Sequence, residues 1–109
     1  MNQVTMARIT VDAGICGFTT RIQTSTADRQ TVKFSYESDC PHVNKAKAEL
    51  TAVDAFAELF KKPHETNVYQ VLSRHLPHVT CPLYSGFLKA IEVTAGMALP
   101  KNAAISIEQ

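Results

Sequence analysis

The sequence has no tryptophan, no long apolar run and no surplus of either charge. No stretch approaches the roughly 18 apolar residues of a membrane-spanning helix, and the first residues lack the pattern of a secretory signal. Eleven lysine and arginine residues stand against ten aspartate and glutamate residues, without a basic cluster. We therefore expect a cytoplasmic protein that binds neither membranes nor nucleic acid.

Cysteine is scarce as well, and the number of cysteines is odd: Cys16, Cys40 and Cys81. Three cysteines without a signal peptide do not suit a disulfide framework, because the cytosol keeps thiols reduced. They are free thiols or ligands. The sequence also lacks a Ser-His-Asp arrangement, a P-loop and a dinucleotide-binding fingerprint, so we expect a binding protein and not an enzyme.

The hydrophobic pattern predicts one domain over residues 1–109, because 45% hydrophobic residues can fill a modest core without disulfides. Strict alternation, as in Ala7, Ile9 and Val11, predicts three antiparallel strands at about residues 4–12, 18–26 and 30–38. Apolar spacing of three or four predicts helices at about residues 41–60, 67–76 and 82–98.

The order of these elements predicts an α+β fold, a three-stranded antiparallel sheet followed by three to four helices on one face. The last residues, Ala104 to Glu108, alternate two isoleucines with polar residues. This pattern fits either an additional edge strand or a segment that lies on the surface.

Each cysteine falls at a junction between predicted elements, where a cysteine that merely fills the core is not expected. Cys16 lies between Gly14 and Gly17 at the tip of the first predicted hairpin. Glycines permit tight turns and let backbone N–H groups approach a bound anion or cluster.

The other two cysteines each precede a proline, in Cys40-Pro41 and Cys81-Pro82. Proline favours the first position of a helix, so we predict that both cysteines cap helix N-termini. The helix dipole and the free N–H groups there favour thiolate over thiol, which predicts a lowered pKa for both.

The cysteines are 24 and 41 residues apart, unlike the close ligand pairs of zinc knuckles and ribbons. The antiparallel order nevertheless brings the hairpin tip and the end of the third strand to one end of the sheet, where the last helix can begin. We therefore predict one shared thiolate site, with partly buried free thiols as the alternative.

Three thiolates leave one position of a tetrahedral metal, or of one cluster iron, without a protein ligand. The nearby candidates for a fourth ligand are His42, His78 and Asp39. Each has an ordinary alternative, as a solvated histidine or as a charge at a helix N-terminus. An added thiol, water or substrate is a further candidate for this position.

The motifs Gly14-Ile15-Cys16-Gly17, Cys40 at a helix start, and Leu76-Pro77 ahead of Cys81 stand in an order that resembles a known family. This order is similar to the iron-sulfur scaffold proteins of the IscU and NifU N-terminal type, over about residues 4–98. The resemblance implies that the three cysteines hold a nascent iron-sulfur cluster, which is then passed to apoproteins. The A-G-I-C-G-F and paired C-P motifs also resemble a small group of uncharacterised prokaryotic proteins.

Two of the departures from the scaffold pattern lie close to the cysteines. Phe18 stands where the scaffolds have an aspartate that is tied to cluster release, and Thr80 stands where they have a histidine. The resemblance therefore implies slower transfer or a shielded site. We expect the following residues to line it: Gly14, Gly17, Phe18, Pro41, Thr80 and Pro82.

The leading hypothesis from the sequence is thus an iron-sulfur cluster or metal-binding protein, scaffold- or carrier-like. A persulfide relay or a zinc site would use the same cysteines. A non-catalytic protein interaction module is the alternative of another class. We also expect protein partners that give or accept the cluster or sulfur. The protein itself is expected to be a monomer or a homodimer.

Overall fold

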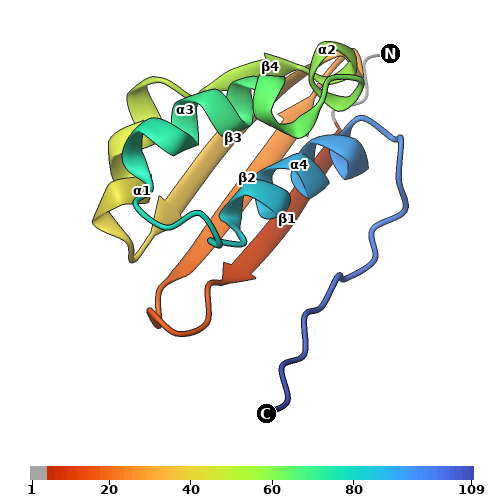
Figure 1. Ribbon diagram of the computed structural model, residues 1–109. Coiled ribbons are helices and arrows are strands. Elements are labelled where there is room, and N and C mark those ends of the chain that lie inside the picture. Colours follow the sequence, from red (N-terminus) through yellow and green to blue (C-terminus); the bar gives the residue numbers. More distant parts are fainter. Residues whose placement is uncertain (1–4) are drawn as a thin grey trace.

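The computed structural model describes residues 5–109 and has the predicted α+β class (Figure 1). An antiparallel sheet of four strands, in the order β1-β2-β3-β4, carries the helices on one face (Figure 1). The strands are β1 (Thr5–Asp12), β2 (Thr19–Thr26), β3 (Thr31–Ser38) and β4 (Ala52–Asp54). The α-helices are α1 (Pro41–Lys45), α2 (Ala55–Leu59), α3 (Asn67–His75) and α4 (Leu83–Thr94), with 3-10 turns η1 (Ala46–Ala48) and η2 (Pro63–Glu65).

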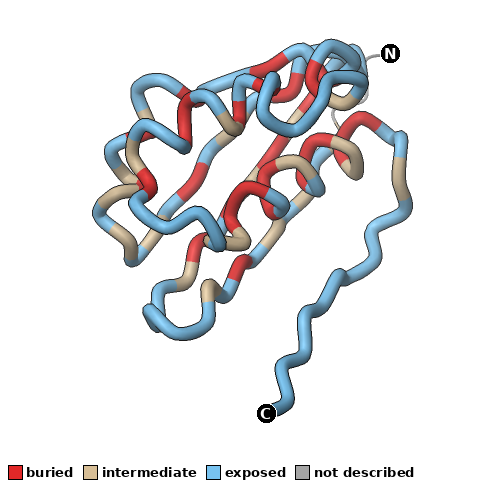
Figure 2. The backbone as a smooth tube through the Cα atoms, in the orientation of Figure 1, coloured by how far each residue is buried: buried red, intermediate tan, exposed pale blue. Residues whose placement is uncertain are grey.

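The core lies between the inner face of the sheet and α4, which packs across β1 and β2 (Figure 2). Alternation in the strands supplies this face, since Ile22 and Tyr36 pair across β2 and β3 and are both buried. Phe87 of α4 is fully buried, and its ring meets the edges of Phe34 and Tyr36 at centroid distances of 5.3 and 5.0 Å.

The predicted helix at 41–60 is wrong, because the chain there breaks into α1, η1, β4 and α2. Val53 pairs with Val32, so that β4 covers the edge of β3 and makes a fourth strand. The apolar spacing that suggests a helix arises from separate short elements that all bury residues in one core. Asp54 then caps α2 by accepting a hydrogen bond from the N–H of Ala57 at 3.1 Å.

The three predicted strands and the last two helices are found close to their expected positions. Residue 4, the predicted start of the first strand, lies outside the described residues. The last helix is shorter than predicted. It ends at Thr94 because Gly96 has a φ of 79° and the N–H of Met97 returns to the carbonyl of Glu92 at 2.8 Å.

Of the two alternatives for the C-terminal residues, the edge strand is not found: residues 99–109 are exposed and have no regular structure (Figure 2). Within the described part of the chain, no helix has both the length and the apolar character needed to cross a membrane.

Candidate functional site

Cys16 is exposed in the tight turn that joins β1 to β2. The N–H of Gly17 donates to the carbonyl of Gly14 at 2.9 Å, and both glycines have positive φ values of 75° and 87°. Only glycine adopts such angles without strain, so the two glycines of the motif define the turn. The prediction that Cys16 lies at a hairpin tip is confirmed.

Cys40 lies where β3 turns into α1, and it is half-buried against the core. It is the N-cap of α1, with Pro41 at the first helical position, as predicted. Its N–H donates to the hydroxyl of Ser38 at 3.0 Å, and its carbonyl accepts from the N–H of Asn44. The backbone that carries the thiol is therefore held by hydrogen bonds on both sides of the residue.

Cys81 does not cap α4, which corrects the second helix-cap prediction, because Pro82 itself occupies the N-cap position. The thiol is half-buried at the edge of the core. Burial raises the pKa of Cys81, although the N–H of Leu83 acts in the opposite direction. The predicted lowering of this pKa is wrong, since desolvation outweighs the single N–H contact.

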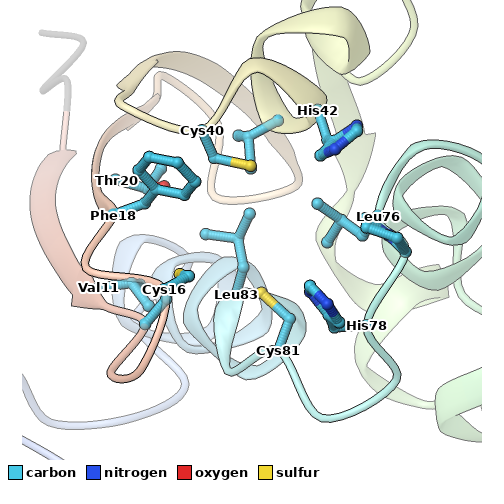
Figure 3. A pocket seen from close by; sticks show the side chains of 13 residues that line it. Val11, Cys16, Phe18, Thr20, Cys40, His42, Leu76, His78, Cys81 and Leu83 are labelled. Atoms are coloured by element: carbon cyan, nitrogen blue, oxygen red, sulfur yellow. The ribbon is translucent and has the colours of Figure 1, made fainter.

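All three cysteines line one cavity of about 130 Å³ at the end of the sheet (Figure 3). The sulfurs of Cys40 and Cys81 point toward its middle from opposite sides, with Cys16 at a third position (Figure 3). Negative charge on the sulfur of Cys16 or Cys40, when either thiol ionises, also raises the pKa of Cys81. Three residues that are distant in the sequence therefore share one electrostatic environment.

The cavity is not a closed metal site. Across residues 5–109, no group of three His, Cys, Asp or Glu side chains has an arrangement that could hold a metal ion. The three cysteines therefore share a cavity, while the ligand distances of a bound metal are not present in this conformation.

His42 and His78 both line the cavity, whereas Asp39 does not. Asp39 instead accepts a hydrogen bond from the N–H of Thr19 at 3.2 Å and pairs with Arg21 at 4.0 Å. Asp39 is therefore engaged by Thr19 and Arg21 at the end of the sheet. The two histidines remain the candidates for a fourth ligand beside the cysteines.

Among the predicted lining residues, Phe18 faces the cavity (Figure 3). The remaining five, Gly14, Gly17, Pro41, Thr80 and Pro82, are chain neighbours of the cysteines and do not line it. They shape the turns that carry the thiols instead of forming the wall.

Comparison with known families gives one match, to a family of unknown function, DUF6951, over residues 7–107. The chain belongs to this family. No curated protein and no solved structure matches it. The DUF6951 region takes in the three cysteines, the two cavity histidines and the chain beyond α4 as far as Ile107.

The wall of the cavity in this DUF6951 protein is largely apolar. The wall residues that the sequence did not suggest are Val11, Ala13, Thr20, Val43, Leu76, Pro77 and Leu83. A signal for some of them was present, because strand alternation places Val11 on the inner face, and Leu76 and Leu83 flank the segment that carries Cys81. No lysine or arginine lines the cavity, so His42 and His78 are the lining side chains that can carry a positive charge.

Proposed function

We propose that this protein binds an iron-sulfur cluster as cargo, through the thiolates of Cys16, Cys40 and Cys81, and carries it to another protein. The observation that supports this most directly is the common cavity, which gathers three thiols from three separate element ends. Thiolate sulfur is the preferred donor for iron-sulfur clusters, and one cluster iron would remain for an added ligand.

The electrostatics of the cavity favour a cationic occupant. Burial raises the pKa of Cys81, and no lysine or arginine lines the cavity to offset the charge of a thiolate. An iron ion or cluster would supply the missing positive charge and displace the protons from the thiols. Its affinity should therefore fall as the pH is lowered.

Loading requires the three thiols to move closer together, since the ligand distances are not preformed. The turn that carries Cys16 is suited to such a movement. A Cβ atom placed on Gly14 or Gly17 would meet no atom within 4 Å, so neighbouring side chains do not wedge the turn in place. Cys40 and Cys81, which pack against the core, would form the fixed side of the site.

His42 and His78 are the candidates for the fourth ligand, because imidazole replaces thiolate in some clusters. The three free thiols need a reducing compartment, which is why we propose the cytoplasm as the place of action. Partner proteins that donate and accept the cluster follow from the role of a carrier.

The proposal is tested by purifying the protein without oxygen and reconstituting it with ferrous iron and sulfide. We expect a brown protein with visible absorption, and we expect Cys16→Ser, Cys40→Ser and Cys81→Ser each to lose most of the cluster. His42→Asn and His78→Asn test the fourth ligand. His64→Asn is their matched control, since His64 is exposed and does not line the cavity.

Other results would assign the site differently. A colourless protein with one zinc per chain would indicate a stable zinc site. A colourless, metal-free protein whose triple Cys→Ser variant still bound its partner would indicate an interaction module.

A persulfide relay is the second candidate, and the exposure of Cys16 favours it. In that reaction the Cys16 thiolate attacks the outer sulfur of a donor persulfide, and the donor leaves as a thiolate. One extra sulfur atom on Cys16, seen by mass spectrometry without bound iron, would support the relay over the carrier.

A further inference from the structure

The outer edge of β1 is open along its whole length. β1 is the first strand of the sheet and pairs with β2 in an unbroken register from Thr5↔Thr26 to Asp12↔Thr19. Within residues 5–109, no other strand pairs with it. This edge contains neither a proline nor a bulge, which are common devices that prevent another strand from adding.

The chain beyond α4 has the pattern of a strand that lacks a partner. We call residues 99–109 the C-terminal arm. Its apolar residues alternate with Ser106 and Glu108, so that Ile105 and Ile107 would share one face of a strand. These isoleucines are 83% and 88% exposed, and no regular structure is assigned to any residue of the arm.

Residues 96–98, which precede the arm, are hydrogen-bonded to the end of α4, and this geometry directs the arm away from its own sheet. Gly96, Met97 and Ala98 donate backbone hydrogen bonds to the carbonyls of Val93 and Glu92 at 2.8 to 3.2 Å. Pro100 restricts the next step of the chain. The arm then runs free of the body on the side of β1 without joining the sheet (Figure 1).

The open edge of β1 and the C-terminal arm are complementary in their apolar pattern and in their charge. On the inner face of β1, Ala7 and Ile9 are only half-buried, so part of their apolar surface stays exposed beside the open edge. On the outer face, Arg8 carries a positive charge, and Glu108 is the single charged side chain between Asn102 and Gln109. The family region includes both Arg8 and Ile107, so most of the edge and nearly all of the arm lie within the matched residues 7–107.

We infer that the arm of one molecule adds as a strand to the β1 edge of a second copy, and that the exchange is reciprocal. Adding a strand satisfies the open N–H and C=O groups of β1 and places Ile105 and Ile107 on the inner face. Reciprocal exchange gives a closed two-fold dimer in which neither β1 edge is left open.

The test measures the mass of the full-length protein in solution by light scattering after size exclusion. We expect a dimer for the natural sequence and a monomer for Ile105→Lys/Ile107→Lys. The matched control is Ala104→Lys/Ser106→Lys, which adds the same two charges to the opposite, solvent-facing side of the added strand and should remain dimeric. The cluster content should be the same in all three proteins.

Hydrogen exchange separates this pairing from other arrangements. Amides of β1 and of the arm should be protected in the natural protein and should lose protection together in Ile105→Lys/Ile107→Lys. A monomer with a protected arm would show docking on the chain's own edge and would overturn the inference. A monomer with an unprotected arm, or a dimer that survives Ile105→Lys/Ile107→Lys, would overturn it as well.

Discussion

Gly86 of α4 lies directly against Val11 of β1, so closely that a Cβ atom on Gly86 would stand 2.4 Å from Cγ2 of Val11. Val11 also lines the cysteine cavity, and Cys81 lies just before α4. The absence of a side chain at residue 86 therefore sets how closely the helix approaches the sheet, and with it the width of the cavity.

Gly86→Ala should destabilise the protein by about 1–2 kcal/mol, because overpacking outweighs the better helix propensity of alanine. Urea unfolding measures this change. Val11→Ala in the Gly86→Ala background should recover part of the loss, since it removes the clashing methyl groups. An unchanged free energy of unfolding in Gly86→Ala would contradict the contact.

Glu58 is a buried carboxylate that holds the start of α3. It is 1% exposed, and its two oxygens accept hydrogen bonds from the N–H groups of Asn67 and Val68 at 2.7 and 3.1 Å. Glu58→Gln should cost about 1–3 kcal/mol, since one amide N–H would face a backbone donor. Glu65→Gln, at an exposed carboxylate that bonds the N–H of Lys62, should change stability by less than about 0.5 kcal/mol in the same unfolding measurement.

Asp28 closes the turn between β2 and β3 and makes stability depend on pH. The N–H groups of Thr31 and Gln30 donate to its carboxylate at 2.9 Å, which holds the pKa of Asp28 below its ordinary value of 3.8. A lowered folded-state pKa gives stability that is present above pH 3.8 and is lost as the pH falls through the folded-state value. Asp28→Asn should weaken this acid dependence in thermal melts at pH 2–5, and an identical pH profile would refute it.

The thiols should react in a definite order. Exposed Cys16 should be alkylated first, and Cys81 should react only in more alkaline solution because burial and the two neighbouring thiolates raise its pKa. Cys16→Ser/Cys40→Ser should move the reaction of Cys81 to lower pH. Mass spectrometry after timed alkylation measures this, and an unchanged pH profile would show that the thiols do not share one environment.

Replacing Phe18 tests its departure from the pattern of the iron-sulfur scaffold proteins, which have an aspartate at this place. It lines the cavity and is 37% exposed, and we expect its ring to limit the access of water to a bound cluster. Phe18→Asp should shorten the lifetime of a bound cluster and speed its transfer to an apoprotein. Equal lifetime and transfer in Phe18→Asp and the natural protein would make the shielding role wrong.

The sequence predicted the elements whose periodicity is long and regular. Strand alternation around Ile22 and the helical spacing around Phe87 extend over eight residues or more, and both were found. The segment around Val53 could not be predicted in this way, because its strand is three residues long and is defined by pairing with Val32. Local spacing does not contain that long-range contact.

The same limit applies to the site. The glycine turn of Cys16 and the helix cap of Cys40 are local features, and they were predicted. The raised pKa of Cys81 depends on burial by residues from other elements, which the Cys-Pro motif does not encode. The apolar wall of the cavity depends on tertiary packing in the same way.

The most direct test of the three-thiolate cluster site is native mass spectrometry of the protein purified and handled without oxygen. We predict one added mass of iron and sulfide per chain that is absent in Cys16→Ser, in Cys40→Ser and in Cys81→Ser, while His64→Asn keeps it. A chain that carries no iron and sulfide after anaerobic purification and reconstitution, or one that keeps them when any single cysteine is replaced, would contradict the account.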